Sequence, residues 1–331
     1  MKKEIITDVP NNDLPYTVEV RKGTGVEEFA HWYNGHRDYI SENLLKSGAM
    51  LFQGIQIASI HDFDRLTELI SKKFRNYVDG SYPRKKLAGH TYVSTEYDAN
   101  YRITMHNELS YSVKWPTLLL FGCIIPAAEG GETPLVDSRR ILDRMNPDLL
   151  KEFEAKDIRY VRNLHSGSGF GPSWKETFET EDKKVVEKYC NEIDIQYQWK
   201  DDDHLKLTHT RPSVREHPVT GERVWFNQVD QFHPSHFPQE IYETLIMMTD
   251  GNGEDLPLYV SFGDGTPITE DIVREVQRTI DEGVIERPWV QGDFVVIDNM
   301  LVAHGRAPYK GKRQIVVSME ADEIYNQVPV S

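Results

Sequence analysis

Cysteine is scarce in this chain. The 331 residues include two cysteines, Cys123 and Cys190, and neither belongs to a Cys-x-x-Cys pair. A disulfide framework or a cysteine-ligated zinc site is therefore not expected. The chain also lacks an N-terminal apolar run of signal-peptide length and any window near the roughly 18–20 apolar residues of a membrane span. These absences predict a cytoplasmic protein without a membrane partner.

Basic charge is also in short supply. Lysine and arginine total 38 against 53 aspartates and glutamates, which gives a formal net charge of −15. Binding of nucleic acid or of an anionic membrane needs basic surface, so neither is expected as a partner. Two local basic clusters are interpreted as solvated surface; they comprise Lys72, Lys73, Arg75, Arg84, Lys85 and Lys86.

No repeat and no linker rich in proline, glycine or serine divides the chain, so residues 1–331 are expected to form one domain. Apolar periodicity predicts strands over 16–20, 49–54, 115–125, 134–136, 205–208, 224–228, 293–298 and 314–319. It predicts helices over 36–46, 62–77, 138–144, 146–155, 183–193, 238–248 and 270–283. This mainly β pattern with helices (α+β) favours an antiparallel double-sheet jelly roll, a double-stranded β-helix, with helices outside it. The middle segment, about 138–290, is expected to be an insertion over its mouth.

The most informative stretch is 103–111, which is interpreted as a strand. Side chains two residues apart on a strand share a face, so His106 and Glu108 are expected to project together. A third metal ligand must come from elsewhere, and His304 near the C-terminus is the best candidate. Two histidines and one carboxylate with open positions opposite them are typical of non-haem Fe(II) oxygenases. A His-x-Glu triplet alone is weak, and the hypothesis depends on the combination.

Two further residues fit a dicarboxylic cosubstrate that chelates such a metal. Arg313 follows His304 by nine residues and opens the next predicted strand. Arginine binds a carboxylate through two parallel hydrogen bonds, so Arg313 suits the far carboxylate of the cosubstrate. The hydroxyl of Thr133 can donate to the same group.

The segments 48–54, 105–111, 130–134, 224–228 and 304–313, in this order, resemble the TauD/TfdA family of Fe(II)/2-oxoglutarate-dependent dioxygenases, and most of all its syringomycin-type natural-product hydroxylases. The resemblance implies that His106, Glu108 and His304 bind Fe(II). It implies that Thr133 and Arg313 hold 2-oxoglutarate, which reacts with O2.

Four positions depart from the common family pattern: Glu108 where many members have aspartate, Gln53 where arginine is common, Gln314 after Arg313 where many have a second arginine, and Val317 where a basic residue would pair a substrate anion. Val317 disfavours a taurine-like sulfonate. Glu108 disfavours halogenation, because related halogenases have a small residue there.

The resemblance favours hydroxylation of an amino acid or an amino-acid-derived intermediate of secondary metabolism such as antibiotic biosynthesis, free or tethered to a carrier protein. Desaturation and epoxidation stay open, as do a zinc hydrolase and a non-catalytic jelly-roll binding module. A homo-oligomer is also left open. Arg211 and Asn227 are candidate substrate contacts, and the glycine-rich loop 166–171 is interpreted as a lid that excludes water.

Overall fold

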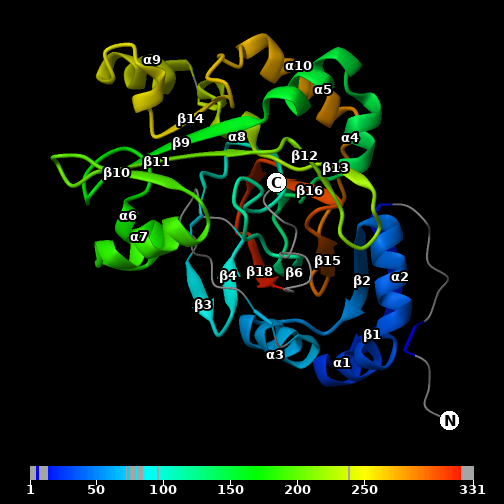
Figure 1. The fold of residues 1–331 in the computed structure, drawn as a ribbon. Helices are drawn as coiled ribbons and strands as arrows, with labels where there is room; N and C mark the ends of the chain where they lie inside the picture. The colour runs from blue at the N-terminus through cyan, green and yellow to red at the C-terminus, as the bar shows by residue number, and fades with distance from the viewer. Residues whose placement is uncertain are drawn as a thin grey trace.

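The largest sheet of the protein has seven strands (Figure 1). The structure is a computed structural model, and it describes residues 5–6, 14–71, 73–74, 79–80, 85–94, 97–237 and 239–321. Its strands, in spatial order, are β1 (Tyr16–Thr24), β2 (Ala49–Ile55), β15 (Phe294–Asp298), β6 (Leu118–Ile125), β18 (Gln314–Glu320), β4 (Thr91–Val93) and β3 (Lys86–Ala88). A three-stranded sheet contains β5 (Ile103–His106), β16 (Val302–Arg306) and β8 (Leu135–Asp137). A short pair joins β7 (Glu129–Gly130) to β17 (Tyr309–Lys310).

The central strand β6 explains why this sheet is buried on both faces. Alternate side chains of a strand point to opposite faces. Leu119 and Phe121 belong to one buried cluster, which fills the jelly roll, whereas Leu120 and Ile124 belong to a second. A strand buried on both faces has a continuous apolar sequence, which is why residues 118–125 lack the usual polar alternation.

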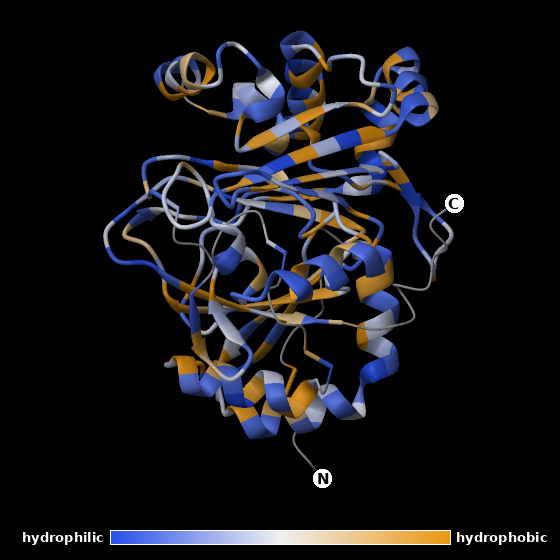
Figure 2. Cartoon of the chain, turned by 60° about the vertical axis from the view of Figure 1, so that its left-hand side comes forward, coloured by the Kyte–Doolittle hydropathy of each residue, from blue (hydrophilic) through white to orange (hydrophobic). Residues whose placement is uncertain are grey.

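The second cluster is covered by three N-terminal helices, α1 (Val26–Gly35), α2 (Arg37–Ser47) and α3 (Ile60–Ile70). Helix α2 ends at Gly48, whose φ of 78° is the left-handed conformation that glycine adopts readily at a helix end. Helix α3 is shorter than the predicted 62–77, because Ser71 is extended; residues 72 and 75–77 of that prediction lie outside the described residues. Figure 2 shows hydrophobic and hydrophilic residues alternating along the outer helices, as expected where one helix face packs on a core.

Residues between β8 and β15 form a second layer over the jelly roll (Figure 1). Its sheet runs β10 (Gln196–Trp199), β11 (Leu205–Arg211), β9 (Ile158–Leu164), β14 (Leu258–Phe262), beside the hairpin β12 (Val214–Glu216) and β13 (Arg223–Trp225). Its helices are α4 (Ser138–Arg144), α5 (Pro147–Lys156), α6 (Trp174–Phe178), α7 (Lys183–Glu192), α8 (Val229–Phe232), α9 (Gln239–Met248) and α10 (Glu270–Asp281), with 3-10 turns at Pro234–His236 and Gly253–Asp255.

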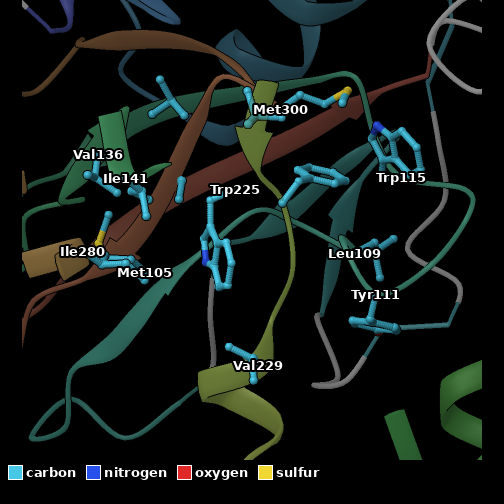
Figure 3. Packing of buried hydrophobic residues seen from close by; sticks show 14 of the residues in the cluster. Met105, Leu109, Tyr111, Trp115, Val136, Ile141, Trp225, Val229, Ile280 and Met300 are labelled. Carbon is cyan, nitrogen blue, oxygen red and sulfur yellow. The ribbon is translucent and has the colours of Figure 1, made fainter. Parts of the chain in front are cut away.

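This layer shares a core with the jelly roll. Phe153 and Tyr160 from the layer belong to the same buried cluster as Leu119 and Val295 from the large sheet. Figure 3 shows Trp225 from β13 and Val229 from α8 in the same buried cluster as Met105 of β5. The 138–290 segment therefore packs directly on the strands that carry the candidate site.

Within the ranges that the structure describes, no helix combines the length and the apolar character that crossing a bilayer requires. Of the basic residues noted in the sequence, Lys73, Lys85 and Lys86 are exposed, whereas Lys72, Arg75 and Arg84 lie outside the described residues.

Candidate metal centre

Strand pairing brings the two candidate histidines together. In the antiparallel pair β16–β5, His304 lies directly opposite His106. Residues opposite each other in such a pair project from the same face at close range. Their ring centroids are accordingly 4.4 Å apart, with an angle of 44° between the planes. Two positions almost 200 residues apart in the chain thus place their imidazoles side by side.

The third candidate ligand, Glu108, lies in a turn and not on the strand that was expected. The prediction of a strand over 103–111 is wrong beyond His106, where β5 ends and a turn follows. Within that turn Leu109 has a φ of 55°, a left-handed conformation that ends extended structure. Glu108 therefore does not reach the histidines by strand alternation. The turn carries it there, and its Oε2 lies 4.0 Å from His106 Nε2.

Asn299, in the turn between β15 and β16, fixes the backbone of Glu108. Its Oδ1 accepts from Glu108 N at 2.7 Å, and its Nδ2 donates to Glu108 O at 2.9 Å. The same Nδ2 donates to Pro116 O at 2.9 Å. Asn107 Nδ2 donates in turn to Asn299 O at 2.7 Å. These hydrogen bonds connect the Glu108 turn to the turn that leads into the His304 strand, and Asn299 is fully buried.

Together these side chains form a group that can hold a metal ion. One ligand atom each from His106, Glu108 and His304 lies within 4.8 Å of the others, and all three residues are buried. His106 Nδ1 lies 2.9 Å from Thr104 O. A carbonyl can only accept, so Nδ1 carries the proton and Nε2 is left with its lone pair toward the cluster. The donor set and the tautomer therefore suit a divalent transition metal.

Several contacts keep β5 in this position. Gln228 Nε2 donates to Asn107 O at 2.8 Å, and Gln231 Nε2 donates to Thr104 O at 3.3 Å. A Cβ at Gly305 would come within 2.6 Å of Ile103 O, so only glycine lets β16 approach β5 this closely after His304.

Thr133 lies on the wall of a cavity inside the jelly roll. Phe121 and Leu135 also line it, and Phe121 packs against the His304 ring at 5.4 Å between centroids. Trp289 Nε1 donates to Thr133 Oγ1 at 3.1 Å. Because the indole can only donate, the Thr133 hydroxyl keeps its own hydrogen for another acceptor. Neither Trp289 nor its role was predicted, since no local pattern marks this contact.

Arg313 directly precedes β18. Its Nε donates to Gly131 O at 2.9 Å, and its guanidinium also donates to Ser94 Oγ at 3.3 Å. The guanidinium packs over the Tyr309 ring at 5.4 Å. Burial, followed by the nearby Arg306, lowers the pKa of Arg313 to about 10. It therefore stays a cation at neutral pH.

The two candidate substrate residues make other contacts. Arg211 donates to the backbone carbonyls of Ile193 and Asp194, at the end of α7. Asn227 Nδ2 donates to Ser213 O at 2.9 Å, and its Oδ1 accepts from Val229 N at 3.1 Å, so it orders the start of α8. The structure does not bring either side chain into the metal cluster.

His236 ends the 3-10 turn Pro234–His236 that follows α8. Burial lowers the pKa of His236 to about 4. Phe170 of the glycine-rich loop packs against Phe237, the next residue, at 5.9 Å. The lid role of that loop stays a prediction.

The fold and the cluster define a class: a jelly-roll protein with a buried site of two histidines and one carboxylate, the arrangement of non-haem iron oxygenases. The chain belongs to the TauD/TfdA family, since the family model described as "Taurine catabolism dioxygenase TauD, TfdA family" matches residues 12–319. It is therefore an Fe(II)- and 2-oxoglutarate-dependent dioxygenase. The family predicted from the sequence motifs is confirmed, whereas closeness to the syringomycin-type hydroxylases stays a prediction.

Similar proteins and solved structures agree with the assignment to this family. The dapdiamide synthesis protein DdaC of Enterobacter agglomerans is 34% identical over 94% of this chain and 92% of its own length. A clavaminate synthase-like protein of Arabidopsis thaliana is 29% identical over 88% and 87%. PvcB of Pseudomonas aeruginosa has a similar structure, with a TM-score of 0.53, 12% identity and coverage of 97% and 93%. AAD-2, solved with Mn(II) and N-oxalylglycine, gives 0.53 at 13% identity, with 96% of each chain covered. These structures confirm the predicted jelly-roll fold.

Proposed function

We propose that His106, Glu108 and His304 are the ligands of the Fe(II) ion. The observation that carries this proposal is the β16–β5 register, which sets one imidazole opposite the other, with Glu108 held beside them by Asn299. Three protein ligands on one side of an octahedral ion leave three positions for cosubstrate and O2. The burial of all three side chains keeps bulk water away from them.

Thr133 and Arg313 are proposed to bind the distal carboxylate of 2-oxoglutarate. The hydrogen of the Thr133 hydroxyl is available, because Trp289 already donates to its oxygen. Arg313 supplies the positive charge, and a buried guanidinium binds a carboxylate more strongly than an exposed one does. The relative AAD-2 was solved with N-oxalylglycine, which has two carboxylates as 2-oxoglutarate does.

The proposed reaction is hydroxylation of an amino acid or an amino-acid-derived intermediate in secondary metabolism. When bound, iron and 2-oxoglutarate supply the oxidising chemistry: 2-oxoglutarate becomes succinate and CO2, and one oxygen atom of O2 enters a C–H bond of the substrate. The similarity to a protein named for dapdiamide synthesis supports such a substrate and a role in antibiotic biosynthesis. Desaturation or epoxidation with the same cofactors is the alternative, and tethering to a carrier protein is part of the proposal.

An assay of succinate formation tests the ligand assignment. The enzyme is incubated with Fe(II), 2-oxoglutarate and O2, and succinate is measured for the wild type, His106→Ala and His304→Ala. We expect both variants to form no succinate above background. The matched control is His61→Ala, which removes an exposed histidine on α3 and should leave turnover unchanged. Wild-type rates in His106→Ala would contradict the assignment.

A mass-spectrometric screen tests the substrate class. Free and carrier-loaded amino acids are incubated with the complete system, and a product heavier by one oxygen atom is sought. Loss of two hydrogens instead would identify a desaturase. Products that arise only from compounds without an amino-acid skeleton would contradict the proposed substrate class.

A further inference from the structure

A buried carboxylate on α8, the short helix that packs against the strand of His106, takes no part in the roles assigned so far. Asp230 is the second residue of α8 and is 4% exposed. Helix α8 packs against β5, the strand that ends at His106. The hydrogen bond from the neighbouring Gln231 to Thr104 O fixes this contact.

The alternation of β5 shows on which face of the strand Asp230 lies. Met105 points into the hydrophobic core, where it belongs to the same cluster as Ile280 (Figure 3). Thr104 and His106 must then project from the opposite face, together. Burial raises the pKa of the Asp230 carboxylate, whereas the Thr104 hydroxyl and the backbone N–H groups of Gln231 and Asp230 lower it by a smaller amount. Asp230 thus lies beside the face of β5 that carries the candidate iron ligand.

Asp230 has no positive counter-ion within the described part of the chain. No lysine, arginine or histidine there forms an ion pair with it, and the other charged group that acts on it is the acidic Asp281. Burial and Asp281 together raise the pKa of Asp230 to about 6. A buried carboxylate without a counter-ion costs a protein free energy even when it is hydrogen-bonded, and carboxylates whose pKa is raised in this way cluster at functional sites.

We propose that Asp230 is a specificity-determining residue that binds a protonated amine of the substrate. This inference rests on the proposed function and narrows it to substrates that carry an ammonium group. An ammonium ion offers three donors and the missing positive charge, and charge-assisted bonds of this kind are roughly twice as strong as neutral ones. The amine would lie on the His106 side of β5, within reach of the Thr104 hydroxyl.

The rival role for Asp230 is structural. A carboxylate in the first turn of a helix stabilises its N-terminus, and α8 is four residues long. The two roles predict opposite effects of Asp230→Asn on the ligand-free protein. If the charge is kept for a ligand, the neutral isostere raises the melting temperature, because it removes an unpaired buried charge. If the charge serves the helix, the melting temperature falls.

The first experiment is therefore thermal unfolding of the full chain without ligand. It compares the wild type with Asp230→Asn and with the control Asp143→Asn, which removes an exposed carboxylate on α4. We expect a higher melting temperature for Asp230→Asn and little change for the control. A melting temperature for Asp230→Asn below that of the wild type would overturn the proposal.

The second experiment measures recognition of the amine. The probes are the standard amino acids, each paired with its N-acetyl derivative, which has the same skeleton without the charge. The enzyme loaded with Mn(II) and N-oxalylglycine is titrated with each probe, and thermal stabilisation reports binding. We expect the best free amino acid to bind at least about tenfold more tightly than its N-acetyl partner, a difference of about 1.4 kcal/mol. Asp230→Asn should abolish this preference.

The proposal would be overturned if the wild type bound each amino acid and its N-acetyl derivative equally well. It would also be overturned if Asp230→Asn kept the wild-type preference for the free amino acid. The binding measurement needs no turnover, so its result is independent of the succinate assay that tests the proposed function. If the wild type forms succinate but no free amino acid binds better than its acetylated partner, then Asp230 does not select an amine, and the oxygenase assignment still stands.

Discussion

Replacement of Asn299 by alanine should uncouple Glu108 from the strand that carries His304. The Asn299 side chain makes three hydrogen bonds to backbone groups, two to Glu108 and one to Pro116, at 2.7–2.9 Å. The site is fully buried, so alanine leaves three backbone groups without partners. Each such group costs about 1–3 kcal/mol, which gives a loss of at least about 3 kcal/mol. That is a large fraction of the 5–15 kcal/mol by which a typical domain is stable.

The loss at Asn299 should also reach metal binding. Residues that orient a metal ligand contribute about 10–100-fold to affinity, and Asn299 holds the turn that positions the Glu108 carboxylate. Titration with Fe(II) under anaerobic conditions measures the affinity, and urea unfolding measures the stability. Asn299→Asp is a second variant that keeps the acceptor for Glu108 N and replaces the donor to Glu108 O and Pro116 O with an acceptor.

A matched control separates the two effects. Asn163 Nδ2 also donates to two backbone carbonyls, those of Glu254 and Leu256, in the sheet above the jelly roll. Asn163→Ala should lower stability and leave Fe(II) affinity unchanged. Fe(II) binding by Asn299→Ala and Asn299→Asp that is as tight as binding by Asn163→Ala would refute a role of Asn299 in metal binding.

Three further changes have expected outcomes. Trp289→Phe removes the donor to Thr133 and should raise the KM for 2-oxoglutarate about fivefold, for a bond of about 1 kcal/mol, with kcat retained; an unchanged KM in steady-state assays counts against the cosubstrate site. Arg162→Met leaves Asp79 buried without its ion-pair partner and should cost about 3–5 kcal/mol in urea unfolding; a loss below 1 kcal/mol would show that water reaches the pair. The pKa of Asp230, raised from 3.8 to about 6, destabilises the fold by about 3 kcal/mol above pH 6 and less as the pH falls toward 4. The stability gap to Asp230→Asn should therefore narrow over that range, and a constant gap would contradict the shift.

The sequence predicted the elements whose signals are local. The pair Asn146 and Pro147 predicts the start of α5, and Asn146 Oδ1 does accept from Asp148 N. The apolar run before Ile125 predicts β6. Helix α1 was missed although Phe29, Ala30 and Tyr33 are buried on one face, because the surrounding polar residues mask their spacing. Strands β9 and β14 were missed because their residues depend on each other for burial across the sheet.

The candidate site shows the same limit. His106, Glu108 and His304 can be selected by residue type and order, but their meeting depends on the β16–β5 register, which no local pattern encodes. Glu108 was chosen for a strand alternation that the structure does not have, and the turn at Leu109 carries it to the cluster instead. The roles of Asn299 and Asp230 depend on contacts with residues distant in sequence, so the amino-acid sequence taken alone gave no signal for either residue.

Anaerobic Fe(II) titration of the wild type, Glu108→Gln and His304→Ala tests the central claim most directly. The wild type should bind one Fe(II) per chain, and addition of 2-oxoglutarate should produce a metal-to-ligand charge-transfer band. Each variant should bind Fe(II) at least about 100-fold more weakly, beyond the effect of residues that only orient ligands, and should lack the band. Wild-type affinity with an unaltered band in His304→Ala would show that the iron is held elsewhere.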